Sequence, residues 1–276
     1  MSAVAAPAGA GAATPATRPA AGPSPLDMGP LDTAAQAVYA AVPALANDWS
    51  CRPRADHPDP VVLLHGTLEP AVVAWRTLVP RLRADGYCTF APSYGDVASG
   101  PLEQSAAQIA VFVDRVRAAT GAARVDIVGH SIGGVLPRYY VRLLGGAPKV
   151  VRLVALAPIN HGSTVDGEVL GPICPGCAQE FDPRSPFMTR LNQGGDTVPG
   201  ISYTVISSRD DEMVTPFRSQ GLSGPPDRVT DVVLQDRCPA DTSNHSTILD
   251  DPVAAQWVLE ALRSPGPADP AFVPVC

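Results

Sequence analysis

The stretch Val125-Asp-Ile-Val-Gly-His-Ser-Ile-Gly-Gly-Val-Leu136 decides the fold of this 276-residue chain. It begins as a short apolar strand, turns sharply at Ser131 and continues as the start of a helix, so it carries a G-x-S-x-G motif in a strand-turn-helix setting. A side chain at Gly129 or Gly133 would collide with neighbouring backbone in so sharp a turn. The motif therefore predicts an exposed, nucleophilic hydroxyl on Ser131; the alternative is a glycine-containing turn without chemistry.

Alternating strand and helix patterns around this motif predict an α/β fold. Apolar runs typical of buried strands occupy residues 61–64, 87–91, 125–128, 151–157, 201–207 and 229–234. Helical spacing of apolar residues marks 74–82, 101–120, the segment after Ser131, and a closing helix that contains Val253 and Leu262. Strands that alternate with helices form a parallel sheet. We therefore expect a mostly parallel central sheet flanked by helices.

Composition predicts how the chain is divided. Residues 1–30 are rich in Ala and Pro and lack the basic start and leucine-rich core of an intact signal peptide, so we expect a disordered leader. With 45% hydrophobic residues in the chain, residues 31–276 can form a single domain, although segment 31–47 fits either a helix or a draped segment. Residues 160–200 are rich in Gly and Pro, and we expect them to form a cap or substrate-binding insertion near Ser131.

The charge of the chain argues against several classes of partner. The net charge is −7 and Lys149 is the only lysine, so there is no basic surface for nucleic acid. The longest apolar runs, such as residues 150–158, are too short to span a bilayer. We therefore expect a soluble protein with no nucleic-acid partner and no transmembrane segment.

The six cysteines form an even set, which favours disulfide bonds and an exported protein. The close pair Cys174-Pro-Gly-Cys177 could instead be redox-active or bind a metal. A redox pair is expected at the start of a helix after a strand, and a zinc site needs a second pair of ligands nearby. Neither context is present in the sequence, so a structural disulfide is the favoured interpretation, and no metal or organic cofactor is expected.

A nucleophilic serine needs a base within hydrogen-bond reach and an acid that orients this base. In sheets of this type the partners follow in the order Ser, Asp or Glu, His. His245 lies beyond the last predicted strand and is predicted to be the base, whereas His161 follows the strand after the motif and is expected to line the cleft. The acid is expected in the loop after strand 201–207, where position alone does not choose between Asp210 and Asp211, and Glu212 is a third candidate.

The oxyanion of a tetrahedral intermediate needs two hydrogen-bond donors. One is the backbone N–H of Ile132, which follows the nucleophile, and the other comes from the loop after an early strand. His65-Gly-Thr67 lies in that loop, so we assign the N–H of Thr67, with its hydroxyl as a candidate third donor. The alternative for this tripeptide is a simple turn at the end of a strand. His65 and His130 are interpreted as structural residues beside the site.

Matched stretches along most of the chain carry a family resemblance. They are Asn47-Asp-Trp-Ser-Cys51, residues 61–67, Asp85-Gly-Tyr-Cys88, residues 129–134 with Pro137-Arg-Tyr-Tyr140, residues 158–163 and 191–200, Asp211-Glu-Met-Val-Thr-Pro216, and the segment around His245. With them the chain resembles the bacterial class 2 lipases (triacylglycerol lipases) of the α/β-hydrolase superfamily over roughly residues 49–262. Ser163 departs from the pattern, which often has Thr after Gly; this affects loop packing and not the chemistry.

The resemblance implies an α/β-hydrolase fold with its cap after the strand that follows the nucleophile helix. It implies Asp211 as the acid, because the family's acid precedes a Glu-hydrophobic-Val segment. It also implies a Cys51–Cys88 disulfide; Cys174–Cys177 and Cys238–Cys276 are then the expected pairs of the other four cysteines, whose pairing the sequence leaves open. The implied protein is a secreted serine carboxylester hydrolase with a Ser131-His245-Asp211 triad, acting on lipid or small-molecule esters, with transient contact to a lipid–water interface.

Other functions remain open at the level of sequence. A short-chain esterase, a polyester depolymerase and an acyltransferase would use the same triad, since chain-length preference depends on cap geometry. A non-catalytic lipid-binding protein with the same fold is the alternative of a different class, although non-catalytic relatives usually lose a triad member and all three positions are filled here.

Overall fold

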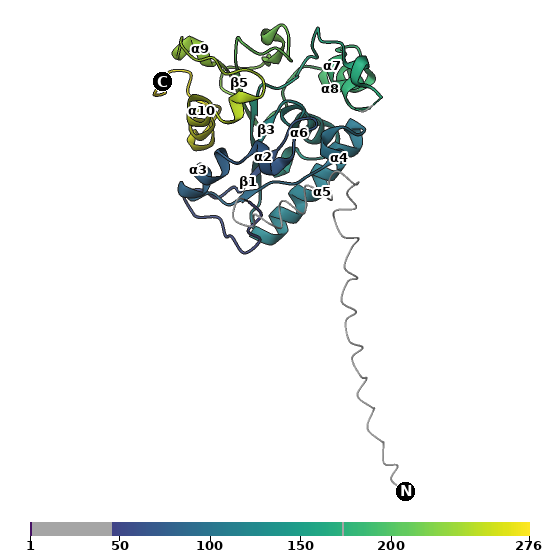
Figure 1. Cartoon of the computed structure of the whole chain (residues 1–276). Helices are drawn as coiled ribbons and strands as arrows, with labels where there is room; N and C mark the ends of the chain where they lie inside the picture. The colour runs from purple at the N-terminus through teal and green to yellow at the C-terminus, as the bar shows by residue number, and fades with distance from the viewer. Residues whose placement is uncertain (2–45, 173) are drawn as a thin grey trace.

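The computed structural model describes residue 1 and residues 46–172 and 174–276 of the chain. The predicted leader, apart from its first residue, and nearly all of segment 31–47 lie outside the described residues. Within them, six parallel strands form one sheet in the order β2-β1-β3-β4-β5-β6 (Figure 1). These strands are β1 (Val61–Leu64), β2 (Thr89–Phe90), β3 (Val125–His130), β4 (Val150–Leu156), β5 (Ser202–Ser207) and β6 (Val229–Val233). The predicted fold class is confirmed.

Helices cover both faces of the sheet, because alternate side chains of each strand point to opposite faces. On one face, Val62 and Leu64 of β1 pack with helices α5 (Leu102–Thr120) and α6 (Ile132–Leu143). On the other face, Val61 and Leu63 pack with α3 (Leu78–Ala84) and α10 (Pro252–Arg263). Figure 1 shows α3 and α10 on one side of the sheet and α5 on the other. The strands are therefore buried on both faces, which is why they read as continuous apolar runs.

The predicted helix 74–82 is two helices in the structure, α2 (Ala71–Ala74) and α3. A second difference is α4 (Gly95–Ala98), a turn that the sequence analysis did not predict. Its residues have positive φ angles, from 53° at Asp96 to 61° at Gly95, so the turn is left-handed. The carbonyl of Val97 accepts a hydrogen bond from the N–H of Leu68 at 2.7 Å, so this turn supports the loop after β1.

The connection from β4 to β5 contains residues 160–200, the segment predicted to be a cap or substrate-binding insertion and called the insertion below. It contains the 3-10 helix η2 (Gly167–Leu170) and the helices α7 (Cys177–Phe181) and α8 (Pro186–Asn192). The N–H of Gly176 donates to the carbonyl of Ser99 at 2.8 Å, which holds the start of α7 against the segment after α4. The remaining short elements are η1 (Ala147–Lys149), η3 (Phe217–Gln220), α9 (Leu234–Arg237) and η4 (Thr247–Leu249).

Three disulfides join the cysteines of the chain. They connect Cys51 to Cys88, Cys174 to Cys177, and Cys238 to Cys276. The first holds the segment before β1 to the start of the edge strand β2, the second lies at the start of α7, and the third holds the chain end to the end of α9. Among the described residues, no helix has both the length and the apolar composition needed to cross a bilayer.

Candidate active site

Ser131 occupies a strained turn between β3 and α6. Its φ is 53° and its ψ is −124°, a backbone conformation that side-chain-bearing residues rarely adopt. A Cβ on Gly129 would lie 2.0 Å from the carbonyl oxygen of Gly133, and one on Gly133 would lie 2.2 Å from that of Leu64. The motif glycines thus allow the backbone of the turn to pack this closely. The Ser131 residue is mostly buried, not exposed as expected, but it opens onto a cavity.

Asp211 and His245 are brought together although they are 34 residues apart. The Nδ1 atom of His245 lies 2.9 Å from Oδ2 and 3.1 Å from Oδ1 of Asp211. The carboxylate also accepts hydrogen bonds from the N–H groups of Met213 and Val214 and from the side-chain amide of Gln220. Burial raises the pKa of the Asp211 carboxyl, but the hydrogen bond to His245, the charge of His245 and the two backbone N–H groups outweigh it, so that the pKa lies below its usual value.

The other two acid candidates are placed differently. Asp210 is exposed and follows Ser208, whose hydroxyl accepts the Asp210 N–H. Glu212 is exposed too, and its Oε2 accepts the backbone N–H of His245 at 3.3 Å. Of the three, only Asp211 contacts the imidazole, so the structure distinguishes positions that the sequence alone left open.

Ser131 and His245 line the same cavity. Both residues lie within the described part of the chain, and no hydrogen bond joins the Ser131 hydroxyl to Nε2 of His245 there. In enzymes without bound substrate this contact is often long and shortens only in the substrate complex. The structure therefore contains a hydrogen-bonded Asp211–His245 pair, and Ser131 faces the same cavity as His245.

The loop after β1 lies against Ser131. A Cβ on Gly66 would lie 3.2 Å from the Cβ of Ser131, so the backbone of this loop closely approaches Ser131. Within the described residues, neither the N–H of Thr67 nor that of Ile132 donates a hydrogen bond. The two predicted oxyanion donors are thus available for a ligand, and Thr67 lines the same cavity as Ser131.

Glu69 and His130 are hydrogen-bonded to each other beside the site. Nδ1 of His130 lies 3.0 Å from Oε2 of Glu69, and Nε2 lies 2.8 Å from the backbone carbonyl oxygen of His245. The N–H of Gly66 also donates to Oε2 of Glu69. Because Nε2 faces a carbonyl, it must donate, and the ring holds the backbone of His245. The sequence pattern predicted a structural role for His130, whereas Glu69 belongs to no motif that would have singled it out.

The cavity around Ser131 has a volume of about 450 Å³. Its wall combines polar groups with apolar side chains from the loop after β1, from α2 and from the insertion. Leu68 and Val73 belong to this wall, and each remains 47% exposed. Phe181 of α7 and Met213 of the Asp211 loop add to it. The site is therefore an open cleft with an apolar rim.

Glu180 is a buried carboxyl in this cavity that the sequence analysis did not single out. It lies on α7 and is only 1% exposed, and its two oxygens are 2.9 and 3.0 Å from the hydroxyl of Thr67. Burial raises the pKa of Glu180 to about 7, although the hydrogen bond from Thr67 lowers it. The insertion thus contributes an ionisable group directly beside the predicted oxyanion loop.

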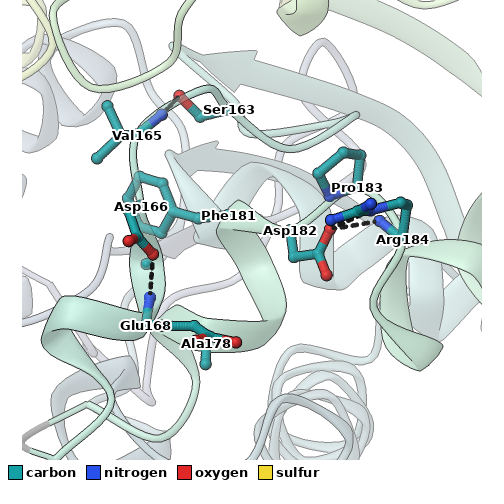
Figure 2. Close-up of a pocket in the computed structure, with 10 residues that line it drawn as sticks. Ser163, Val165, Asp166, Glu168, Ala178, Phe181, Asp182, Pro183 and Arg184 are labelled. Carbon is teal, nitrogen blue, oxygen red and sulfur yellow. Dashed lines mark hydrogen bonds and ion pairs between the residues drawn. The ribbon is translucent and has the colours of Figure 1, made fainter.

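A second cavity, of about 460 Å³, lies within the insertion and shares Phe181 with the first. Figure 2 shows its acidic side chains engaged with nearby groups: Asp166 accepts the N–H of Glu168, and Asp182 pairs with Arg184. No predicted site residue lines this cavity. Apart from Phe181, it shares no lining residue with the cavity at Ser131.

His161 does not line the cleft as expected. Its Nε2 lies 3.0 Å from Oδ1 of Asp196, and its Nδ1 lies 2.8 Å from the carbonyl oxygen of Ser219. Asp196 also pairs with the buried Arg138 of α6. These contacts join the insertion to the loop before β6. His161 follows a strand end, as a site residue would, but its polar atoms are used in this link.

Comparison with known proteins extends these observations. Residues 58–258 match the model of the family described as Lipase (class 2). Among solved structures, the chain is similar to Aspergillus fumigatus lipase B, with a TM-score of 0.68 and 22% identity over 78% of this chain and 55% of that one. It is also similar to the mature form of Bacillus licheniformis lipase BlEst2, with a TM-score of 0.58 and 14% identity over 76% of this chain and 94% of that one. At these identities the structural similarities show the fold alone.

Proposed function

Since the chain belongs to the class 2 lipase family, a family of carboxylic ester hydrolases, we propose that it hydrolyses lipid or related esters through Ser131, His245 and Asp211. The chain spans only about half of Aspergillus fumigatus lipase B, the fungal structure compared above. The proposal therefore rests on the site of this chain. The observation that carries it is the Asp211–His245 hydrogen bond at a cavity into which the strained Ser131 opens.

In the proposed reaction, the Ser131 hydroxyl attacks the ester carbonyl and His245 takes its proton. The same proton then goes to the leaving alcohol, and an acyl-enzyme remains. Water, deprotonated by His245, attacks the acyl group and releases the carboxylic acid and free Ser131. Asp211 orients the imidazole and stabilises its charge, and the N–H groups of Thr67 and Ile132 bind the oxyanion. No step needs a metal or an organic cofactor.

Apolar side chains around the nucleophile support an ester with a hydrophobic acyl or alcohol part. Leu68 and Val73 are each 47% exposed and line the same cavity as Ser131, and apolar side chains grouped at a cleft are typical of a binding site. These side chains can contact a lipid–water interface or the acyl chain of a single substrate molecule. A short-chain esterase and an acyltransferase remain rival functions of the same triad, and no specific contact of the site favours either of them.

We also propose that the protein acts outside the cytoplasm. The structure pairs its six cysteines in three disulfides, and such bonds persist mainly in oxidising compartments. Measuring free thiols in the denatured protein, with and without reductant, tests this proposal. Six free thiols without reductant in protein isolated from its native source would contradict it.

The central experiment compares wild type with Ser131→Ala on p-nitrophenyl butyrate. Ser131→Ala is expected to lose hydrolysis by about 10⁶-fold or to background, as expected for loss of a serine nucleophile. Ser223→Ala is a matched control, because Ser223 is exposed in a loop away from the cavity. A fluorophosphonate probe should label wild type and Ser223→Ala at Ser131 and leave Ser131→Ala unlabelled. Labelling and hydrolysis that survive Ser131→Ala would contradict the proposal.

Substrate preference separates the rival functions. A lipase is expected to hydrolyse emulsified long-chain triglyceride and to gain activity at the interface, whereas a short-chain esterase is limited to soluble butyrate esters. An acyltransferase would form a new ester when an alcohol is added, in preference to free acid. The replacement of both Leu68 and Val73 by Ser should reduce activity on the emulsion more than on the soluble ester if the apolar rim contacts lipid.

A further inference from the structure

The carboxyl of Glu180 is placed where it can control a donor of the oxyanion site. Both of its oxygens lie within 3.0 Å of the Thr67 hydroxyl. Within the described residues this hydroxyl is its only hydrogen-bond partner, and no cation pairs with it. A buried carboxyl without a cation is more stable in its neutral form than in water. Its protonation state therefore has consequences for Thr67.

A hydroxyl has one proton to donate. When Glu180 is ionised, the carboxylate can only accept, so the proton of the Thr67 hydroxyl is used in that bond. When Glu180 is protonated, the carboxyl can donate to Oγ1 of Thr67, and the hydroxyl proton is free to point into the cavity that Ser131 lines. The ionised form also places a negative charge beside the site where the oxyanion develops, which opposes its formation.

We propose that Glu180 is a positioning residue: it must carry its proton for the Thr67 hydroxyl to serve as a third oxyanion donor. This inference rests on the proposed function and adds to it a control of rate by a residue of the insertion. Because burial raises the pKa of Glu180 to about 7, the change of state falls in the neutral range. The donor is thus lost as the pH rises above neutrality.

Other ionisable groups line the cavity with Glu180 or lie close to it. They are Glu69 of the loop after β1, Tyr94 before α4, His130 at the end of β3, and Glu212 and His245 of the loops after β5 and β6. None of them forms a hydrogen bond with Glu180. A variant that changes Glu180 alone, compared with wild type at each pH, cancels their contributions.

The test is the pH profile of kcat/KM on p-nitrophenyl butyrate for wild type and Glu180→Gln. The glutamine amide is nearly isosteric, cannot ionise, and can donate to Oγ1 of Thr67 at every pH. The ratio of kcat/KM of Glu180→Gln to kcat/KM of wild type should rise by about tenfold or more from about pH 5.5 to about pH 9, with its midpoint near pH 7. The upper limit of this rise is about 10²- to 10³-fold, the loss of rate when one oxyanion donor is removed. The change should appear in kcat more than in KM, since the oxyanion exists only in the transition state and the intermediate.

Two further variants keep the test decisive. Glu168 is an exposed residue of the same insertion. The ratio of kcat/KM of Glu168→Gln to kcat/KM of wild type should not vary with pH. Thr67→Val keeps the shape and the backbone N–H but removes the hydroxyl, so the alkaline loss of activity in this variant should be much smaller than in wild type. If Glu180→Gln does not fold, the profile of Thr67→Val alone decides.

A ratio that stays constant from acid to alkaline pH would overturn the inference, and so would an alkaline loss that is unchanged in Thr67→Val. A folded Glu180→Gln that is inactive at every pH would also overturn it, because the ionised carboxylate would then be the active form. All these outcomes presuppose hydrolysis that depends on Ser131. If Ser131→Ala retains the wild-type rate, the proposed function itself fails, which is a separate result.

Discussion

The Nδ1 atom of His245 lies 2.9 Å from Oδ2 of Asp211, in a buried pair at the carboxyl end of the sheet. Asp211 follows β5 and His245 follows β6 and α9, so parallel strands bring their loops to the same edge. The carboxylate is held in turn by the N–H groups of Met213 and Val214 and by Gln220. This network fixes the orientation of the imidazole before any substrate binds.

The first prediction concerns this pair. Asp211→Asn is expected to lower kcat by about 10³- to 10⁴-fold, because the imidazole loses the acceptor that selects its tautomer. Asp210→Asn is the matched control, since Asp210 is the neighbouring residue, is exposed, and does not contact His245. Ester hydrolysis by the two purified variants, with circular dichroism to check folding, measures the difference. Similar losses in both would mean that Asp211 does not have this role.

The second prediction concerns Glu69 and its partner His130. Burial raises the pKa of Glu69, but the hydrogen bond to His130 and the charge of His130 lower it by more than burial raises it, so that the pKa lies below its usual value. Glu69→Gln should therefore reduce the free energy of unfolding at neutral pH by about 1–3 kcal/mol, the usual cost of a lost charged hydrogen bond. It should also reduce kcat, because His130 supports the backbone of His245.

The pH dependence gives this prediction its sign. A carboxyl with a lowered pKa in the folded state stabilises the protein above its unfolded pKa, and the stabilisation disappears as the pH falls through the folded pKa. Urea denaturation of wild type and Glu69→Gln should thus differ at neutral pH and converge in acid. Glu103 lies on the exposed face of α5, so Glu103→Gln should have the same free energy of unfolding as wild type at neutral pH and in acid. A difference that persists unchanged in acid would exclude the ionised carboxylate as its cause.

The third prediction is a stability effect of opposite sign at Glu180. Burial raises the pKa of Glu180 in the folded protein to about 7 from the ordinary 4.5. The contribution of Glu180 to the free energy of unfolding is therefore fully present below the pKa of the unfolded state and is lost as the pH rises through about 7. From mildly acidic to alkaline pH, the free energy of unfolding of Glu180→Gln should rise by about 3 kcal/mol relative to that of wild type. Each pH unit between the unfolded-state and folded-state pKa values of Glu180 corresponds to about 1.4 kcal/mol. Urea denaturation across this range measures it. A constant difference would show that Glu180 is not buried in its carboxylate form at high pH.

Local sequence signals predicted the parts of this molecule that repeat a simple pattern. The strands around Ser131 are apolar because they are buried on both faces, and the glycines of the motif are required by backbone contacts within a few residues. Such features need no knowledge of distant partners. The same holds for the prediction of His245 as the base, which depends only on its order along the chain.

Long-range packing produced what the sequence did not reveal. Glu180 lies in a Gly- and Pro-rich insertion without helical periodicity, and only the docking of α7 brings it to Thr67, 113 residues earlier. The left-handed turn at Gly95–Ala98 has positive φ angles at three residues other than glycine, which no propensity predicts. His161 was assigned to the cleft because it follows a strand, but Asp196 and Ser219 engage both of its nitrogens.

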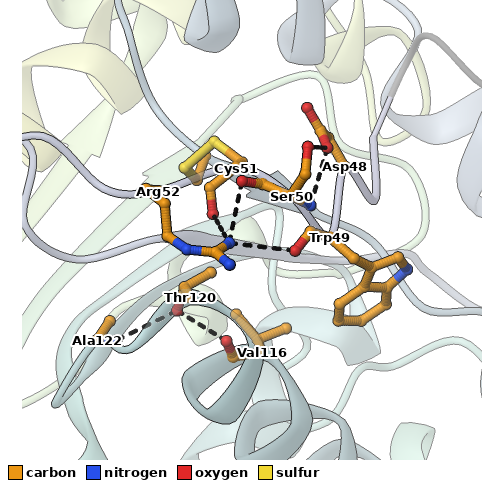
Figure 3. The surroundings of a disulfide bond; sticks show 9 residues. Asp48, Trp49, Ser50, Cys51, Arg52, Val116, Thr120 and Ala122 are labelled. Carbon is orange, nitrogen blue, oxygen red and sulfur yellow. Dashed lines mark hydrogen bonds between the residues drawn. A yellow bond between two sulfur atoms is a disulfide. The ribbon is translucent and has the colours of Figure 1, made fainter.

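The last prediction compares two disulfides of different span. Cys51–Cys88 closes 37 residues and holds the edge strand β2, whereas Cys174–Cys177 closes 3 residues at the start of α7. Chain entropy predicts a stabilisation of about 4 kcal/mol for the longer loop and about 2 kcal/mol for the shorter one. The surroundings of Cys51 include Trp49 and Arg52, whose guanidinium donates to three backbone carbonyls nearby (Figure 3).

Replacement of both cysteines of a pair by Ser should therefore have different effects at the two sites. The Cys51/Cys88 variant should lose more of its free energy of unfolding, with kcat little changed in the protein that remains folded, because Cys88 precedes β2 whereas Ser131 follows β3, at the opposite end of the parallel strands. The Cys174/Cys177 variant should lose less stability but more activity, because Cys177 lines the cavity and starts the helix that carries Glu180. Equal losses of activity in both variants would mean that the position of α7 does not affect catalysis.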